Sequence, residues 1–415
     1  MRRFQLWLYR AMLVLIFLFP SIVPSQSGAQ QIAARSINGI IFVDGVKYRF
    51  TFAGFLQAIS DCTTARTCPG VDARALTGLL NTASTTIVLS KRMFVLLGDV
   101  NIASTANPII DIRANGIQII GTGGFFSGNI VGTTLQDNSN NATTITLRIN
   151  QPGVISGVAV KNVNLMVTQG QKSGDGISLS NAQRNTFEDI FIGGHTTLGT
   201  DAIKLAGADY FNEFRRISIG QANQSFEISG TASSPSNFNW LENSTVGNAG
   251  PGVAIRLDTF ASHNILRNID VEGFTGELGG TQVLGDFNIL DSLHIEGGWK
   301  SRPIYINGTS TVVRDTVIDS SLNYGIVVDS MAVDTVIDAC KFTGNRTGSI
   351  QVVKGAQRTR IINPGGVGRW IKPAAHPRMA AGSVPLASRA TAIATAARRQ
   401  LRQTQSSGPM RPPHT

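Results

Sequence analysis

The sequence predicts an all-β chain folded as a parallel β-helix, a solenoid in which short strands stack coil upon coil. Two observations predict this fold. Between positions 174 and 352, pairs of apolar residues spaced by two recur at short, regular intervals, and a second motif that begins with asparagine recurs with a similar period. Such short repeats are typical of solenoids, because each repeat buries its apolar face only against its neighbours.

Each apolar pair is interpreted as a short strand with one face inward, because side chains alternate along a strand. The residue between the two members then points outward. The pairs are Ile177/Leu179, Ile203/Leu205, Phe226/Ile228, Ile255/Leu257, Ile304/Ile306, Ile326/Val328 and Ile350/Val352.

The second motif places an asparagine at the same point of successive coils. Its asparagines follow one another at nearly constant intervals and are Asn185, Asn212, Asn239, Asn264 and Asn288. Stacked asparagine amides can bond to the turn backbone and to one another, and asparagine tolerates the left-handed conformation of a tight corner. The pattern predicts a structural asparagine ladder.

Other repeat architectures do not fit this spacing. Two short strands in about 25 residues leave no room for a crossover helix, and a propeller blade needs about 40 residues and four strands. Similar apolar strands upstream, such as Ile117 to Ile120, extend the pattern. We expect the β-helix to span residues 85–365.

The ends of the solenoid are expected to differ from its body. Residues 30–84 are predicted to be an N-terminal capping segment, in which Phe52, Phe55, Leu56 and Ile59 lie on one face of a helix over the first coil. A free amphipathic helix for a partner is the alternative. Residues 366–415 form a basic, low-complexity tail that is predicted to be disordered or partly helical.

Residues 1–29 have the layout of a secretory signal peptide. Three arginines flank the start of an apolar stretch from Ala11 to Val23, and small residues surround a cleavage position after Ala29. This stretch is shorter than a membrane-spanning helix, which needs about 20 residues. We expect a secreted protein, extracellular or periplasmic, with no membrane span in the mature chain.

The charge distribution and the three cysteines indicate which class of partner and which disulfide the sequence favours. The formal net charge is +10, but three arginines lie in the expected signal peptide, and the segment from Arg369 to Arg411 holds eight basic side chains without an acid. The body is therefore close to neutral, which argues against nucleic acid as a partner.

Cys62 and Cys68 flank a short polar loop and are expected to form a disulfide, or to remain free thiols, while Cys340 is expected to be buried.

The capping segment, Ile119-Ile120-Gly121-Thr122-Gly123 and the repeated coils resemble the pectate-lyase-like superfamily of right-handed parallel β-helices, including rhamnogalacturonase-type and epimerase-type members. The resemblance covers about residues 40 to 360. It implies a right-handed β-helix that binds or cleaves polysaccharide.

Two coils resemble those that carry the catalytic residues of polygalacturonase-type hydrolases. The first contains Gly174-Asp175-Gly176-Ile177, and the next contains Thr200-Asp201-Ala202-Ile203-Lys204. The resemblance implies catalytic roles for Asp175 and Asp201 and substrate contacts for Lys204 and Arg256. Thr200 stands where that family has a second aspartate, and Asp258 stands where it has a lysine.

The residues themselves also suggest this chemistry. Asp175 and Asp201 hold equivalent positions in neighbouring coils, so their carboxylates are expected to lie about 5 Å apart, the spacing of paired strands. Two close carboxylates can act as an acid and a base on a glycosidic bond. The alternative is structural, because an aspartate before Gly-Ile commonly bonds turn backbone.

A second cluster follows from the later motif. Two successive coils align Asp270 with His294 and Glu272 with Glu296, and Trp299 follows closely. Strand alternation directs these polar side chains outward. The cluster is expected to bind sugar hydroxyls, with Ca²⁺ as a possible cofactor and no other metal site; the alternative is an ordinary solvated sheet face.

Two functions therefore remain open. One is a lyase, hydrolase or epimerase that acts on an extracellular, uronate-bearing polysaccharide. The other is a non-catalytic carbohydrate-binding or surface-structural β-helix.

Overall fold

The structure of the chain is a computed structural model. It describes residues 40–43, 86–90, 92, 94–97, 101–126, 129–168, 172, 174–220, 222–248, 252–273, 279–297 and 302–365. The chain divides into two compact units, residues 1–370 and 371–415, and every described residue belongs to the first. The expected signal peptide, the capping helix around Phe52, the Cys62/Cys68 pair, Trp299 and the tail from residue 366 lie outside the described residues.

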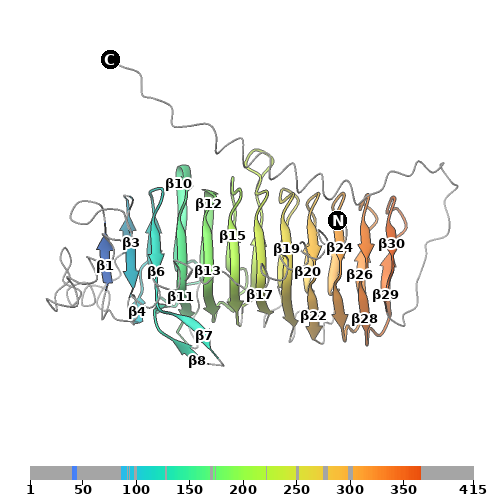
Figure 1. Ribbon diagram of the computed structural model, residues 1–415, viewed down its shortest axis with the longest axis horizontal. Helices are drawn as coiled ribbons and strands as arrows, with labels where there is room; N and C mark the ends of the chain where they lie inside the picture. The colour runs from blue at the N-terminus through green and yellow to red at the C-terminus, as the bar shows by residue number, and fades with distance from the viewer. Residues whose placement is uncertain are drawn as a thin grey trace, which may run out of the picture. The chain divides into compact units, whose positions relative to one another are not determined.

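The described residues form a parallel β-solenoid and contain no helix, so none there could span a membrane (Figure 1). An 11-stranded sheet contains β2 (Ile87–Leu89), β5 (Ile110–Ile112), β10 (Leu147–Ser156), β12 (Ile177–Gln183), β14 (Asp201–Leu205), β16 (Gln224–Ile228), β18 (Ile255–Leu257), β20 (Thr281–Val283), β23 (Ile304–Ile306), β26 (Tyr324–Val328) and β29 (Gly348–Val352).

A 17-stranded sheet forms the rest of the coil wall. It contains β1 (Ile40–Val43), β3 (Phe94–Leu97), β4 (Asn101–Ser104), β6 (Gln118–Ile120), β9 (Thr134–Asp137), β11 (Ala159–Val167), β13 (Thr186–Gly193), β15 (Glu213–Ile219), β17 (Trp240–Asn248), β19 (Ile265–Gly273), β21 (Ile289–Asp291), β22 (His294–Gly297), β24 (Val312–Arg314), β25 (Val317–Asp319), β27 (Val336–Asp338), β28 (Lys341–Thr343) and β30 (Arg360–Ile362). Among the described strands two pairs are antiparallel: β1 with β3, and the hairpin of β7 (Gly124–Phe126) and β8 (Asn129–Val131).

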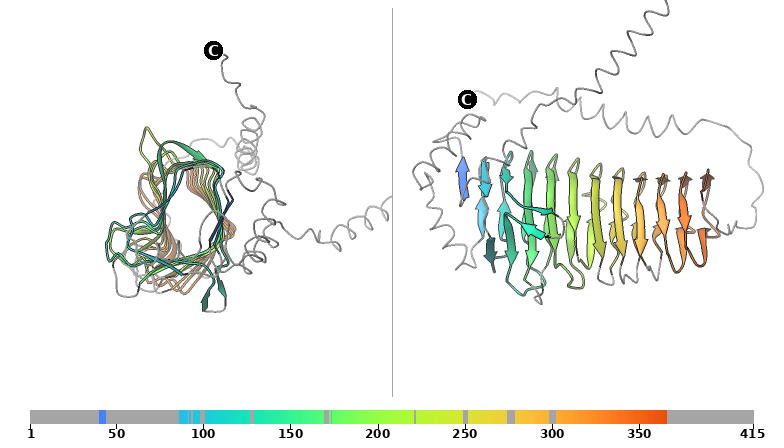
Figure 2. Two further views of the ribbon diagram at one scale, coloured as in Figure 1. Left: turned by 90° about the vertical axis from the view of Figure 1, so that its left-hand side faces the viewer. Right: turned by 60° about the horizontal axis from the view of Figure 1, so that its bottom comes forward.

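The apolar pairs of the first motif are confirmed as stacked inward strands. Ile203 pairs in parallel with Ile177 in the preceding coil and with Phe226 in the following one. Seen along the solenoid, successive coils follow one another closely (Figure 2). The motif missed the coil that contains β20, because its first inward position is the buried Thr281 and not an apolar residue.

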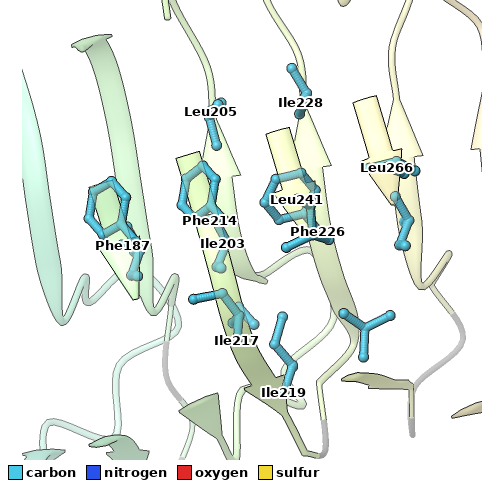
Figure 3. Close-up of a cluster of buried hydrophobic side chains, with 14 of the residues drawn as sticks. Phe187, Ile203, Leu205, Phe214, Ile217, Ile219, Phe226, Ile228, Leu241 and Leu266 are labelled. Atoms are coloured by element: carbon cyan, nitrogen blue, oxygen red, sulfur yellow. The ribbon is translucent and has the colours of Figure 1, made fainter. Parts of the chain in front are cut away.

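The interior is a continuous apolar core along the stack. The Phe187 and Phe214 rings stack in neighbouring coils with centroids 4.8 Å apart, and Phe226 meets Phe214 edge-on at 5.2 Å (Figure 3). Cys340 is a free thiol and is buried, as expected from the sequence. Because every coil contributes inward side chains to one core, the described coils bury their apolar surface jointly.

The asparagine ladder is also confirmed. The Nδ2 amide of Asn212 donates to Oδ1 of Asn239 at 3.0 Å and to the carbonyl of Ala182 at 2.8 Å. In turn, Oδ1 of Asn212 accepts from the backbone N–H and from Nδ2 of Asn185. The same pattern continues through Asn264 and Asn288.

The left-handed corner lies one residue earlier than the sequence suggested. The ladder asparagines are not among the positive-φ residues, whereas the residue before each of them is. These corner residues are Arg184, Phe211, Phe238, His263 and Phe287, with φ between 53° and 60°. The asparagine side chain bonds the backbone across coils, so the preceding residue makes the turn.

Among the described coils, those from β10 to β19 contain the two expected strands, whereas the three from β20 to β28 contain three. The strands of the second motif bend at a further positive-φ residue, such as Asp189 in β13 and Arg216 in β15. From β21 and β22 onward the two limbs are separate strands, with Ser292 at the bend. A left-handed residue inside a strand reverses the side-chain alternation, and the pattern of apolar residues alone does not reveal it.

Candidate active site

The two aspartates singled out in the sequence lie in neighbouring coils of the 11-stranded sheet. The pairing of Ile177 with Ile203 brings Asp175 level with Asp201. The backbone N–H of Asp201 donates to Oδ1 of Asp175 at 3.0 Å. Asp201 has 3% of its surface exposed, whereas Asp175 is half-buried. One oxygen of Asp175 therefore already bonds the backbone of the next coil.

The following coil adds a third carboxylate. The pairing of β14 with β16 aligns Asp201 with Gln224 and Lys204 with Glu227. Nζ of Lys204 lies 3.0 Å from Oδ2 of Asp201 and 3.8 Å from Oε2 of Glu227. Nε2 of Gln224 donates to Oε2 of Glu227 at 2.6 Å. We call these four side chains, with Asp175, the β14–β16 site.

Sequence reasoning missed Glu227 although a signal was present. Glu227 lies between Phe226 and Ile228, an inward pair of the first motif, just as Lys204 lies between Ile203 and Leu205. The outward residues of equivalent pairs in adjacent coils must be neighbours. Applying the alternation to polar residues as well as apolar ones would have found Glu227.

Burial and charge shift the protonation of this site. Burial, then the Glu227 carboxylate, raises the pKa of Asp201 to about 8, although the Lys204 ammonium opposes the change. Burial also raises the pKa of Asp175. Burial disfavours the charge on Lys204, but the Asp201 and Glu227 carboxylates outweigh it and raise the lysine pKa. At neutral pH the Asp201 carboxyl group therefore keeps its proton, and the Lys204 amine stays charged.

A buried histidine supports the turn that carries Asp175. Nδ1 of His195 lies 2.8 Å from the carbonyl oxygen of Gly174, and His195 is fully buried, which lowers its pKa. A Cβ on Gly176 would lie 2.6 Å from the Ala202 carbonyl oxygen and 3.2 Å from Nε2 of His195. The glycine after Asp175 is thus required by close packing between coils.

The two expected substrate-binding cations have partners within the protein. Lys204 is held between Asp201 and Glu227, as described above. Arg256 lies one coil beyond Glu227, paired with it in register, and its Nη2 lies 3.3 Å from Oδ2 of Asp258. Arg256 keeps 37% of its side chain exposed, and its Nε has no hydrogen-bond partner among the described residues.

The second predicted cluster lies on the other sheet. Asp270 pairs in register with His294 and Glu272 with Glu296, and all four project outside the buried Val271 and Ile295. The structure does not bring this cluster together with Asp175 and Asp201. Asp201 begins β14 and Asp175 precedes β12, and both strands belong to the 11-stranded sheet.

His294 is surrounded by carboxylates in this cluster. Nδ1 of His294 is 3.2 Å from Oδ1 of Asp270, and Nε2 is 3.5 Å from Oδ2 of Asp319, a residue that the sequence did not single out. Burial, then the Asp270 and Glu296 carboxylates, raises the pKa of Glu272. Within the described ranges, no group of three or more histidine, cysteine, aspartate or glutamate residues is arranged to hold a metal ion, so the Ca²⁺ expectation gains no support here.

The raised pKa of Asp201 predicts a pH-dependent cost in stability. Between the ordinary value of 3.8 and about 8, the folded protein keeps a proton that the unfolded chain loses. Stability should therefore fall as pH rises through this window and level off above it. Relative to the Asp201→Asn variant, the wild type should lose on the order of a few kcal/mol of unfolding free energy between pH 4 and pH 9. Urea unfolding at several pH values measures this difference, and a pH-independent difference would contradict it.

No family model matches the sequence, and no curated protein matches it. Solved structures with a similar fold include three that are named for polysaccharide activities. They are the catalytic domain of a GH87 α-1,3-glucanase (14% identity, 68% of this chain and 61% of that chain, TM-score 0.43), the periplasmic alginate epimerase AlgG (7%, 84% and 98%, 0.42) and a capsular polysaccharide depolymerase tailspike of Acinetobacter baumannii bacteriophage Fri1 (11%, 64% and 52%, 0.42).

The chain thus spans 61% of the length of the glucanase catalytic domain. The fold of the described residues is a parallel β-solenoid.

Proposed function

We propose that the protein is secreted and hydrolyses a glycosidic bond of an extracellular polysaccharide at the β14–β16 site, with Asp201 as the proton donor. The observation that carries the proposal is the buried carboxyl group of Asp201, whose pKa is raised to about 8 beside further carboxylates. A carboxylic acid that keeps its proton at neutral pH can protonate a leaving sugar oxygen, while an ionised neighbour completes the reaction.

The state of Lys204 favours hydrolysis over β-elimination. A lyase needs a base to remove a proton next to a uronate carboxylate, and a neutral amine could serve. Lys204 lies between two acids that raise its pKa, so it stays charged and cannot act as this base near neutral pH. Its ammonium instead lies between Asp201 and Glu227.

Arg256 supports a substrate that carries uronate residues. It lies two coils from Asp201 and its side chain is partly exposed, with Nη2 3.3 Å from Oδ2 of Asp258. A guanidinium group can bind a sugar carboxylate bidentately. The acidic sugar would then lie along the outer face of the 11-stranded sheet, beside the bond to be cleaved.

Binding without catalysis is the second candidate function. The partly exposed Asp270, Glu272 and His294, with the exposed Glu296, present carboxylates and an imidazole side by side on the 17-stranded sheet. These groups can bond sugar hydroxyls, and Trp299 remains a proposed stacking partner. Binding of a polysaccharide without release of new chain ends would favour this function.

In the deciding experiment, the full chain is incubated with a panel of acidic and neutral polysaccharides. Hydrolysis should release new reducing ends without the ultraviolet absorbance of unsaturated uronates, whereas elimination would produce both. Asp201→Asn should lower the rate by at least about 10²-fold, the contribution of a general acid. Asp334→Asn, which changes a partly exposed carboxylate paired with Arg358, is the matched control and should keep full activity. Equal rates for both variants would exclude Asp201 as the acid.

A further inference from the structure

We infer that Glu227, and not Asp175, is the carboxylate that works with Asp201, and that it acts as the nucleophile of a retaining glycoside hydrolase. This inference rests on the proposed function. It assigns the second catalytic group, which the resemblance between coils had placed at Asp175.

Asp175 is committed to a structural bond. Its Oδ1 accepts the backbone N–H of Asp201, at the start of β14. The turn that carries it is held by the bond between His195 and the Gly174 carbonyl, and by the close packing of Gly176 against Ala202. This carboxylate therefore links two coils, and a displacement toward a sugar would break that link.

Among the described residues, the contacts that hold the Glu227 carboxylate come from the side chains of Gln224 and Lys204. Gln224 donates to its Oε2 at 2.6 Å, and the Lys204 ammonium lies 3.8 Å from the same oxygen. Its side chain retains 14% exposure on the outer face, more than the 4% of Asp201. The amide and the ammonium orient the carboxylate and stabilise its charge.

The contacts of Lys204 limit the distance between the two carboxyl groups. Oδ2 of Asp201 and Oε2 of Glu227 both lie near Nζ of Lys204, at 3.0 and 3.8 Å, so they are at most about 6.8 Å apart, the sum of these distances. Retaining glycosidases hold their carboxyl groups about 5 to 5.5 Å apart, and inverting enzymes about 6.5 to 9.5 Å apart. The upper bound of about 6.8 Å includes the retaining spacing and excludes most of the inverting range.

The reaction then proceeds in two balanced steps. In the first, a Glu227 oxygen bonds to the anomeric carbon, the glycosidic C–O bond breaks, and Asp201 gives its proton to the leaving sugar oxygen. In the second, the Asp201 carboxylate takes a proton from water, the hydroxide oxygen bonds to the anomeric carbon, and the bond to Glu227 breaks. Both carboxyl groups return to their starting states.

Electrostatics link the same two residues. After burial, the Glu227 carboxylate is the largest contributor to the raised pKa of Asp201, and Asp175 contributes less. The Glu227 carboxylate, which is the proposed nucleophile, therefore also helps to keep the proton on Asp201. Once Glu227 forms its glycosyl ester this charge is lost, which favours ionisation of Asp201 for the second step.

The kinetic test compares Glu227→Gln, Asp175→Asn and Glu213→Gln, the last a partly exposed glutamate of β15 that serves as the matched control. On the polysaccharide that the wild type cleaves, Glu227→Gln should lose at least about 10²-fold in rate and Asp175→Asn far less, while Glu213→Gln keeps full activity. Azide should restore turnover to Glu227→Ala and yield a glycosyl azide, and the wild-type product should retain its anomeric configuration. A larger loss from Asp175→Asn, or an inverted product, would overturn the assignment.

A second measurement needs no substrate. Carboxyl carbon-13 NMR of the full chain follows the titration of Asp201, identified by its loss in Asp201→Asn. The Asp201 pKa should fall in Glu227→Gln by more than in Asp175→Asn; the opposite order would contradict the pairing. If Asp201→Asn is inactive while Glu227→Gln remains active, this inference fails and the proposed function stands. If both variants retain full activity, the proposed function fails.

Discussion

Ile203→Asp is expected to unfold the solenoid. Ile203 is fully buried in the core and pairs in register with Ile177 and Phe226. The substitution removes a large aliphatic side chain, which costs about 2–5 kcal/mol, and leaves an unpaired carboxylate in apolar surroundings. The combined cost is comparable with the whole stability of a typical domain, about 5–15 kcal/mol.

Circular dichroism during heating measures this effect. The variant should lose its cooperative transition or melt far below the wild type. Ser218→Asp in β15 is the control, because Ser218 lies at a half-buried position between the buried Ile217 and Ile219 and can direct a carboxylate to water. A normal melting curve for Ile203→Asp would show that β14 does not face the core.

Asn212→Leu is expected to disrupt the asparagine ladder and to destabilise the solenoid strongly. The Asn212 side chain is fully buried and takes part in four hydrogen bonds to the coils on either side. Leucine fills a similar volume but leaves buried donors and acceptors without partners. Each unsatisfied group costs about 1–3 kcal/mol, so the variant should lose several kcal/mol of unfolding free energy.

Urea unfolding of Asn212→Leu beside Asn101→Leu provides the comparison. Asn101 is exposed in β4 and its side chain bonds Gln136 at the surface, so its loss should change stability by a few tenths of a kcal/mol. Similar midpoints for the two variants would mean that the ladder is dispensable. A change in hydrogen exchange confined to the coils around Asn212 would show how far the defect spreads.

The sequence by itself determined the architecture. Inward pairs such as Ile203/Leu205 and the regularly spaced ladder asparagines recur because every coil must satisfy the same packing and hydrogen-bonding requirements. The same periodicity correctly aligned Asp270 with His294 and Asp175 with Asp201. Register could be predicted because it follows from counting residues between equivalent positions.

The tertiary structure alone decided the chemistry of the site. Coils differ in length, and corners such as Phe211 turn the chain at positions that the apolar pattern does not mark. Burial of Asp201, the contact of Lys204 with both Asp201 and Glu227, and the bond that commits Asp175 to the backbone all depend on neighbouring coils. Desolvation and the direction of a side chain arise from these contacts between coils, and no local pattern of residues encodes them.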